Sequence, residues 1–453
     1  MMKTKEFIGR NHELNLLNKE YQKDSSFVLL TGRRRIGKTR LLKEFIKDKD
    51  ALYFFTNRNN GSLLLNEFSE SVSSYCGIPS AEYRNWKDVF DIFVRSKDGK
   101  KILIIDEFQN MIYSDDSLVS QLQDIWDNIL SQSEIMLILC GSHISVMESQ
   151  YNDYNGPLYG RFTRHITLDP LNFDDIADND FVESVKRYAI HGGVPKYMEL
   201  MGDGDLEDIV RDEIMDPSSV MFEDPNVLMS DEVKNAAGYM AILKAISNGN
   251  HRVSEIASYM QVPVTSLSHP LERLMEMRLI RRDVPVTDSE LKNKNGRYVF
   301  VDNYTSFWFR FVYPFQSSLI IGESDGAIES WKLHFNEHHV SFVFEELCRR
   351  SVFGMSKYIG FVPRKVGRYW NKNNIEIDIV ALDNDGKNAF VAECKFRSNK
   401  PVDLHDLNSL KSKCMNLKEL KGYNLKYGLF SVSGFSDSLF EEDVILWDKG
   451  IMQ

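Results

Sequence analysis

The residues from Gly32 to Thr39 read GRRRIGKT and match the phosphate-binding pattern G-x-x-x-x-G-K-[ST] at every fixed position. Glycines let the backbone wrap tightly and turn its N–H groups toward phosphate oxygens, and a following helix adds its N-terminus. The lysine reaches the β- and γ-phosphates, and the threonine hydroxyl binds Mg²⁺. We therefore expect ATP and Mg²⁺ here, held by Gly32, Arg33, Arg34, Arg35, Ile36, Gly37, Lys38, Thr39 and Arg40. The alternative is a glycine-bearing turn that binds nothing.

Two acids, Asp106 and Glu107, end the apolar run KILIIDE. Where a phosphate loop precedes such a run, one carboxylate holds the Mg²⁺ and a neighbouring one polarises the attacking water. We assign Asp106 to the metal and Glu107, with Lys38, to catalysis. The next apolar run ends in Ser142, which would lie beside the second acid and contact the γ-phosphate or the water. A simple strand cap explains this serine equally well.

A second set of reactive residues lies near the C-terminus, within residues 373–396. Asp378 is on one alternating apolar run, Glu393 and Lys395 are on the next, and an Asn-Asp-Gly turn joins the two runs. Residues two apart share a face of a strand, and antiparallel pairing can bring Asp378 toward Glu393. Close carboxylates repel unless a cation lies between them, and a lysine can position or deprotonate water. We expect Mg²⁺ ligands at Asp378 and Glu393 and a catalytic Lys395. The alternatives are a hairpin with a solvated charged face and an inactive site.

The elements that must position these groups follow from the hydrophobic pattern. Compact apolar runs alternate with helical patterns, which predicts a parallel sheet covered on both faces and hence an α/β fold class. The runs are 26–32, 52–56, 101–107 and 135–142. The predicted boundaries are 1–170 for the phosphate-loop domain, 171–232 for an acidic helical segment, 233–310 for a helix-rich domain and 330–453 for a C-terminal α/β domain.

Residues 233–301 show three helical patterns and a hairpin with an Asn-Gly turn, which is the pattern of a winged helix-turn-helix. Its third helix, 264–277, carries polar side chains for base edges. The hairpin and its approach carry Arg278, Arg281, Arg282, Lys292, Lys294 and Arg297 against Asp283, Asp288 and Glu290. A basic wing on a chain of net charge -11 predicts contact with DNA phosphates. The alternative is a module that packs between domains.

Bulk properties exclude several classes of protein. The net charge argues against a uniformly basic nucleic-acid binder. The five cysteines are scattered without a C-x-x-C pair, so the chain shows neither a zinc knuckle nor a disulfide framework. The N-terminus is too polar for a signal peptide, and no apolar run approaches the roughly 20 residues that span a bilayer. We expect a cytoplasmic protein without a membrane partner.

The motifs FIGRNHEL (7–14), GRRRIGKT, LIIDEFQ, ILCGSHISVM, GPLYGR (156–161) and GGVPKYM (192–198) occur in this order. The chain resembles, over nearly its whole length, the AAA-like P-loop ATPases of the archaeal type, which are related to the signal-transduction ATPases with numerous domains. The resemblance implies that the FIGR turn lies near the adenine, and that residues 171–232 form a lid whose Gly193 and Pro195 close over the nucleotide. It also implies that Arg161 or Arg164 senses the γ-phosphate or reaches a neighbouring subunit of a homo-oligomer. A surface ion pair is the alternative for either arginine.

The arrangement of Asp378 before Glu393-x-Lys395 resembles the PD-(D/E)xK nuclease superfamily, whose fold has a preceding helix with a further acid. That resemblance implies a third metal ligand at Glu345 of SFVFEELCRR, with Glu346 as the second choice. One departure is an acidic strand that reads Ile-Glu-Ile-Asp instead of ending in Pro-Asp.

The predicted protein binds and hydrolyses ATP and couples its nucleotide state to a DNA-binding C-terminal domain with a metal-dependent nuclease site. The alternatives are a nucleotide-dependent switch whose C-terminal domain is inactive and binds only DNA or a protein, and a transcription regulator.

Overall fold

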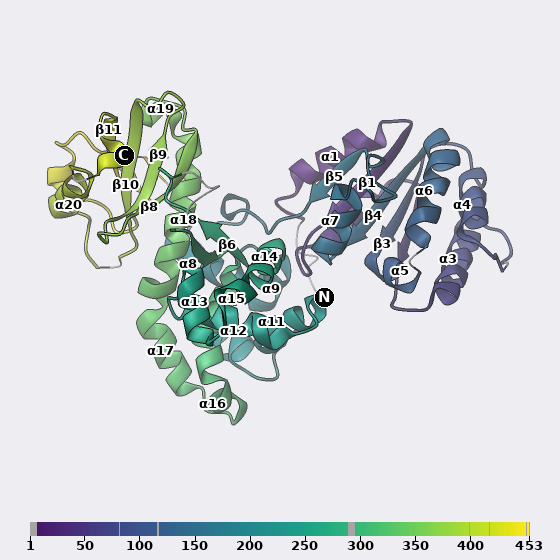
Figure 1. The fold of residues 1–453 in the computed structure, drawn as a ribbon, viewed down its shortest axis with the longest axis horizontal. Coiled ribbons are helices and arrows are strands. Elements are labelled where there is room, and N and C mark those ends of the chain that lie inside the picture. The colour runs from purple at the N-terminus through teal and green to yellow at the C-terminus, as the bar shows by residue number, and fades with distance from the viewer. Residues whose placement is uncertain are drawn as a thin grey trace. The chain divides into compact units, whose positions relative to one another are not determined.

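The computed structural model describes residues 7–80, 82–115, 117–288, 295–397, 399–415, 417–449 and 451–452. The chain divides into two compact units (Figure 1). The first comprises Met1–Asp175 and Val194–Glu199, and the second comprises Ile176–Gly193 and Leu200–Gln453. The short segment Val194–Glu199 lies within the predicted lid, 171–232, but groups with the first unit. The residues directly before and after this segment belong to the second unit.

The first unit contains a five-stranded parallel sheet, as the alternating runs predict. Its strands are β1 (Ser25–Thr31), β2 (Ala51–Phe55), β3 (Lys101–Asp106), β4 (Ile135–Gly141) and β5 (Arg164–Thr167), in the order β2-β3-β4-β1-β5. The short polar run RHIT gave no strand signal, so β5 was not predicted. Because β4 lies between β1 and β3, the residue after β4 emerges between the phosphate loop and the acids.

Helices cover both faces of this sheet because successive strand residues point to opposite sides. Phe27 and Leu29 of β1 belong to one core, and Val28 and Leu30 belong to the other. The first core is closed by α3 (Gly61–Cys76), α4 (Trp86–Arg95), α5 (Gln109–Ser114) and α6 (Leu118–Asn128). The second is closed by α1 (Asn11–Tyr21) and α2 (Lys38–Phe45), and α7 (Ile144–Asn152) follows β4.

The predicted lid is helical, with α8 (Phe181–His191), α9 (Pro195–Met201), α10 (Leu206–Ile209), a π-helix (Val210–Ile214) and α11 (Val220–Glu232). Its core in the second unit is the aromatic helix α15 (Asn303–Phe311). The Tyr304 hydroxyl donates to the Met221 carbonyl at 2.5 Å, and Trp308 Nε1 donates to the Phe222 carbonyl at 2.7 Å. Helix α15 thus fixes the start of α11 by hydrogen bonds that buried aromatic side chains normally need.

The predicted winged helix-turn-helix region consists of α12 (Ala236–Ser247), α13 (Val253–Met260), α14 (Ser268–Glu276), β6 (Ile280–Asp283) and β7 (Arg297–Phe300). The predicted third helix, 264–277, is instead a 3₁₀ turn (Val264–Leu267) followed by α14. Pro270 has no N–H for an α-helical hydrogen bond, so it is accommodated in the first turn of a new helix. Lys292, Lys294 and Glu290 of the predicted wing lie outside the described residues.

The C-terminal part begins with α16 (Gln316–Ile320), α17 (Asp325–Phe335), a π-helix (Asn336–Val340), α18 (Ser341–Ser351) and α19 (Ser356–Ile359). A mixed sheet follows, with β8 (Lys365–Trp370), β9 (Glu376–Leu382), β10 (Asn388–Lys395), β11 (Asn424–Ser431), β12 (Ile445–Asp448) and β13 (Ile451–Met452) side by side. Strands β8, β9 and β10 pair antiparallel, and β10, β11 and β12 pair parallel. Helix α20 (Leu404–Met415) connects β10 to β11.

The wing is built into the C-terminal domain. The Val286 N–H donates to the Arg368 carbonyl of β8 at 2.9 Å, and the Val286 side chain belongs to the core formed by Tyr369 and Ile377. From the far side of the wing, the Asn295 carbonyl accepts a hydrogen bond of 3.2 Å from Trp370 Nε1. The winged helix and the C-terminal sheet therefore share a packed boundary.

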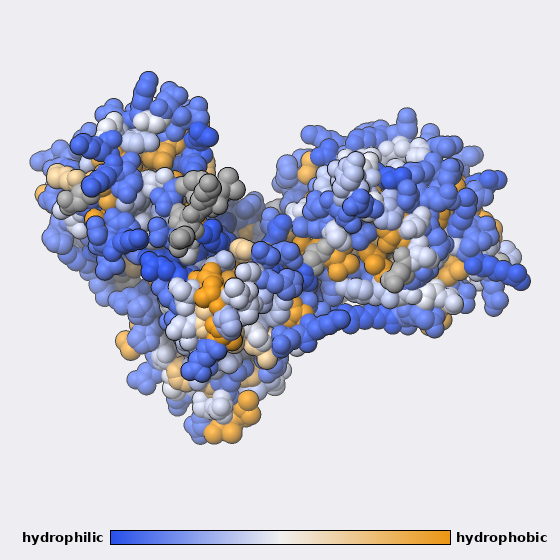
Figure 2. Space-filling model, in the orientation of Figure 1, coloured by the Kyte–Doolittle hydropathy of each residue, from blue (hydrophilic) through white to orange (hydrophobic). Residues whose placement is uncertain are grey.

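Hydrophilic side chains dominate the visible surface in Figure 2. An orange tip at α16 is an exception, where Ile320 is 64% and Ile321 is 76% exposed. In the part of the chain that the structure describes, the helices are too short or too polar to cross a bilayer.

Candidate functional site

The phosphate loop has the backbone that its glycines predict. Gly32 has a φ of +155°, and a Cβ there would lie 2.6 Å from the Leu168 carbonyl oxygen, so a side chain is excluded on steric grounds. Gly37 has a φ of +90° and precedes the first residue of α2. Arg35 has a φ of +70°, a conformation that costs a non-glycine residue energy. The positive φ angles of the loop therefore include both glycines that the sequence pattern requires.

Lys38 is buried inside this loop. Its ammonium donates to the Gly32 carbonyl at 2.7 Å and to the Arg33 carbonyl at 2.9 Å. These carbonyls hold the cation beside the N-terminus of α2, where anions are favoured. A buried ammonium and inward N–H groups are the donors that a phosphate chain needs, so the residues present fit a nucleotide.

The loop is also held from outside by Arg10 of the FIGR turn. Its guanidinium Nη2 donates to the Asp169 carbonyl at 2.6 Å and to the Ile36 carbonyl at 3.2 Å. Burial lowers the pKa of Arg10, and Glu13 partly offsets this effect. The place of this motif near the adenine stays a prediction. Its arginine also braces the loop, a role that the sequence did not reveal.

The oxygen donors expected to hold Mg²⁺ are adjacent. Thr39 Oγ1 donates to Asp106 Oδ2 at 3.0 Å, and Asp106 is fully buried at the end of β3. Tyr53 of β2 donates to the same carboxylate oxygen; it was missed because a tyrosine within an apolar run carries no signal beyond packing. A hydroxyl and a carboxylate beside a phosphate loop are the ligands that Mg²⁺ accepts.

Glu107 is held by two neighbours. Its Oε2 accepts from Ser142 Oγ at 2.8 Å, from the Ser142 N–H at 3.3 Å and from the Gln109 side-chain amide. Burial acts to raise the pKa of Glu107, but the hydrogen bonds from Gln109 and Ser142 and the charge of Lys38 outweigh it and lower the pKa. Ser142 thus lies beside the second acid as expected, and Gln109 is an additional contact within the motif LIIDEFQ.

The Gly-Gly-Val-Pro segment brings lid residues to the loop. The Lys196 N–H donates to the Arg35 carbonyl at 3.3 Å, and the Arg35 guanidinium lies 5.9 Å from the Tyr197 ring centroid. Pro195 Cγ would be 3.8 Å from a Cβ on Gly37. Gly193 precedes this segment with a φ of +75°. Pro195 therefore borders the phosphate loop, and Gly193 supplies the turn before it.

The two candidate sensor arginines are engaged elsewhere. Arg161 forms an ion pair of 2.8 Å with Asp127, and Arg164 forms one of 2.6 Å with the buried Glu20. Arg164 is paired with Val28 in the middle of β1, before the strand reaches the loop. The structure brings neither arginine to the nucleotide site of its own chain. Both form ion pairs, which was the alternative to a role at the γ-phosphate.

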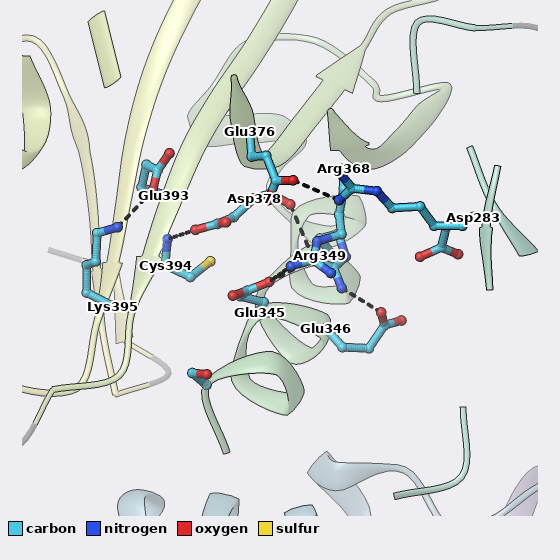
Figure 3. Close-up of polar contacts among 12 residues, drawn as sticks. Asp283, Glu345, Glu346, Arg349, Arg368, Glu376, Asp378, Glu393, Cys394 and Lys395 are labelled. Atoms are coloured by element: carbon cyan, nitrogen blue, oxygen red, sulfur yellow. Dashed lines mark hydrogen bonds and ion pairs between the residues drawn. The ribbon is translucent and has the colours of Figure 1, made fainter. Parts of the chain in front are cut away.

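The C-terminal acids meet as the strand pattern predicts. The β9–β10 register pairs Ile379 with Ala392, so one further step places Asp378 opposite Glu393. Asp378 Oδ2 accepts from the Cys394 N–H at 2.9 Å (Figure 3). Burial, followed by the charges of Glu345 and Glu393, raises the pKa of Asp378 to about 7. The carboxylates are therefore close enough to repel one another.

Basic side chains form ion pairs with the other two acids, Glu393 and Glu345. Glu393 accepts from Lys395 at 2.8 Å and from Lys413 of α20 at 2.7 Å. Glu345 accepts from Arg368 at 2.5 Å, with Arg349 at 3.7 Å. Lys413 and Arg368 were not predicted, because no local pattern indicates a partner from another element. Arg349 lies four residues after Glu345 on α18, a spacing that brings two side chains together on a helix.

These pairings bear on the predicted metal site. Within the described ranges, no group of three or more His, Cys, Asp or Glu side chains is arranged to hold a metal ion. Arginine and lysine side chains instead neutralise Glu345 and Glu393. The roles of Glu345, Asp378 and Glu393 as metal ligands therefore stay predictions.

Two arginines of the predicted basic wing also form ion pairs. Arg281 contacts Glu346 of α18 at 2.7 Å, and Arg297 contacts Glu376 of β9 at 2.8 Å. These two side chains therefore fit the alternative in which the winged helix packs between domains.

Comparison with known proteins matches the same three regions. Residues 7–200 match a family described as an ATPase domain predominantly from Archaea. Residues 240–282 match the arsR family of bacterial regulatory proteins, and residues 308–407 match archaeal and bacterial proteins of unknown function. Among solved structures, a Walker-type ATPase of Pyrococcus abyssi is 20% identical with a TM-score of 0.47, and the match covers 68% of this chain and 97% of that chain.

Two of the relatives that match this chain are MJ0423 and MJECL04, both from Methanocaldococcus jannaschii. An uncharacterized ATP-binding protein, MJ0423, is 39% identical over 44 residues, which are 10% of this chain and 75% of that protein. The uncharacterized protein MJECL04 is 31% identical over 429 residues, which are 92% of this chain and 94% of that protein. This chain therefore belongs to the same family as MJECL04, and its N-terminal domain is an ATPase domain of the type found predominantly in Archaea.

Proposed function

We propose that this protein hydrolyses ATP with Mg²⁺ and uses its nucleotide state to control a nucleic-acid-binding second unit. The observation that carries the first part is the contact between Thr39 and Asp106, which joins the phosphate loop to the acid-bearing strand. Thr39 and Asp106 would hold Mg²⁺, which neutralises charge that develops on the phosphates when it is bound. Lys38 would turn from the loop carbonyls to the β- and γ-phosphates.

Glu107 is the proposed group that orients the attacking water. Its lowered pKa keeps the carboxylate ionised at neutral pH, where it can accept a hydrogen bond from water. Ser142 and Gln109 fix its direction. A general base held by two donors meets the requirement that catalytic groups be positioned before the substrate arrives.

Segment 194–199 is the proposed route of control. It groups with the ATPase unit, and it is covalently continuous with Gly193 and Leu200 of the second unit. A phosphate chain that displaces the Arg35 carbonyl would change its contact with Lys196. The helix-turn-helix of the arsR type makes DNA the proposed partner of the second unit.

The test compares two lysines of α2. Lys38→Ala should abolish ATP turnover, while Lys43→Ala, an exposed change on the same helix, should retain it. Unchanged turnover in Lys38→Ala would refute the proposed ATPase. DNA affinity of the wild type is then measured without nucleotide, with ADP and with a non-hydrolysable ATP analogue. Equal affinities in the three states would refute the proposed control.

A second candidate function is metal-dependent cleavage by the C-terminal domain. The raised pKa of Asp378, between Glu345 and Glu393, favours it, because clustered acids attract a cation. The bound metal would require Lys395 and Lys413 to release Glu393. The ion pairs of the two glutamates favour the rival in which this domain binds without cutting.

Cleavage is tested by incubating the protein with Mg²⁺ or Mn²⁺ and several forms of DNA and RNA. Wild-type cleavage that disappears in Glu393→Ala would establish the nuclease. Intact substrates in every condition would leave the C-terminal domain as a binding module.

A further inference from the structure

An open pocket of about 470 Å³ lies where the wing meets the C-terminal domain. The wing segment 281–288, the end of α18 and the start of β8 form its walls. The Arg281–Glu346 ion pair and the hydrogen bond from Val286 to Arg368 hold these walls together. The pocket is therefore composite, because neither the winged helix nor the C-terminal domain contains all of its walls.

The lining of this pocket is strongly basic. Seven of its side chains are cationic and three are anionic, in a chain whose net charge is -11. The cationic side chains are Arg281, Arg282, Arg349, Arg350, Arg364, Lys365 and Arg368. A concentration of one sign of charge in a concave site raises the local concentration of oppositely charged ligands. The pocket therefore fits an anion that carries several charges.

Acids inside the protein already use part of this charge. Arg281 and Arg349 both contact Glu346, at 2.7 and 2.8 Å, and these contacts hold the walls. Arg364 and Lys365 differ, because both side chains are exposed and neither forms a side-chain hydrogen bond or ion pair with the described residues. These two cations at the rim are available to phosphate oxygens.

An aromatic side chain lines the same pocket. Phe353 follows α18 and is 56% exposed, although a phenylalanine is normally buried. Aromatic rings beside a basic groove are the platforms on which proteins stack unpaired bases. A duplex keeps its bases stacked inside, so the ring favours a single strand.

We infer that this composite pocket binds a single-stranded nucleic acid segment, with phosphates at Arg364 and Lys365 and an unpaired base on Phe353. The inference deepens the proposed nucleic-acid binding of the second unit and rests on it. The pocket lies beside the wing, so a strand that separates from a bound duplex would enter it directly.

The test measures fluorescence anisotropy of labelled single-stranded DNA, single-stranded RNA and duplex DNA with the full chain. The double variant Arg364→Gln/Lys365→Gln should bind single strands at least about fivefold more weakly, and its log–log salt dependence should be shallower by about 1.4. Lys387→Gln/Lys421→Gln removes the same charge from exposed sites outside the pocket and should behave like the wild type.

Base stacking is tested separately. Phe353→Ala should weaken single-strand binding about tenfold and leave the salt dependence unchanged. Tyr358→Ala removes a neighbouring aromatic ring that is 54% exposed and does not line the pocket, so it should have no effect. Circular dichroism verifies that each variant is folded. The DNA and RNA strands show whether the 2′-hydroxyl matters.

Three outcomes would overturn the inference. First, both pocket variants could bind single strands with wild-type affinity, which would exclude the pocket as the binding site. A loss of duplex binding in His269→Ala of the third helix would then still support the proposed function of the winged helix. Second, a wild type that binds duplex DNA but no single strand would refute the pocket proposal and leave the proposed winged-helix function standing. No binding of any form by the wild type would overturn both proposals.

Discussion

The hydroxyl of Thr39 lies 3.0 Å from the carboxylate of Asp106, although the two residues are 67 positions apart in the chain. Thr39 is in the first turn of α2, and Asp106 is the last residue of β3. Strand β4 separates β3 from the phosphate-loop strand in the sheet. The contact therefore depends on the sheet order, and it assembles the two halves of the nucleotide site.

Glu107→Gln should separate ATP binding from hydrolysis. The amide keeps the size of the side chain but cannot act as a base, so turnover should fall by about 10²- to 10⁴-fold. ATP affinity, measured with a fluorescent analogue, should remain within a few-fold of the wild type. Ser142→Ala removes only a positioning hydrogen bond and should reduce turnover less. Full turnover in Glu107→Gln would assign the water to another residue.

Gly32→Ala should abolish nucleotide binding, because its Cβ would lie 2.6 Å from the Leu168 carbonyl and force the loop open. Gly77→Ala is the matched control. It also has a positive φ, of +67°, but a Cβ there meets no atom within 4 Å. That variant should cost about 1 kcal/mol of stability and leave binding intact. Calorimetric titration with ATP measures the affinity of both variants, and urea unfolding measures the stability of Gly77→Ala. Wild-type affinity in Gly32→Ala would contradict the loop geometry.

The Arg281–Glu346 ion pair should contribute measurably to the stability of the second unit. Burial raises the pKa of Glu346, but Arg281 and Arg349 outweigh it and hold the pKa far below its usual range. A double-mutant cycle with Arg281→Gln and Glu346→Gln should give a coupling energy of about 1–2 kcal/mol in urea unfolding. The more exposed pair Lys332–Glu207, at 2.6 Å, should give a smaller coupling energy. Equal couplings would mean that the wing contact is only peripheral.

His339 should make the second unit sensitive to acid. Its Nε2 donates to the Ala189 carbonyl at 2.6 Å, and burial lowers the pKa of His339 to about 3. Below about pH 6.5 the unfolded chain binds a proton that the folded protein refuses until about pH 3, so stability falls as the pH falls. The loss should reach about 2 kcal/mol between pH 7 and pH 5.

Denaturant unfolding at several pH values tests this dependence. His339→Gln should lower stability at pH 7 and flatten the slope toward pH 5. The neighbouring His338 is exposed, so His338→Gln should retain the wild-type slope. His191, whose pKa burial also lowers to about 3, should account for part of the remaining slope. Identical slopes in the wild type and His339→Gln would exclude His339 as a source.

The phosphate loop and its acids were predictable because their signals are local and strands β1, β3 and β4 are continuous apolar runs. The proximity of Asp378 and Glu393 was predictable for a similar reason, because the alternation of each strand and the single turn between them determine which residues face each other. The partners of the acids were not predictable. Lys413 and Arg368 come from other elements, and charge satisfaction across elements depends on the complete fold. The same limit applies to Arg161, which Asp127 holds away from the loop.

Val286 has a consequence for how the second unit unfolds. The helix-turn-helix match ends at residue 282 and the next family match begins at residue 308, so the valine falls in the interval that neither family covers. Yet its side chain completes the core under β8 and β9. A cut at the family boundary would leave a hole in the following domain. The winged helix and the C-terminal domain should therefore unfold in a single transition.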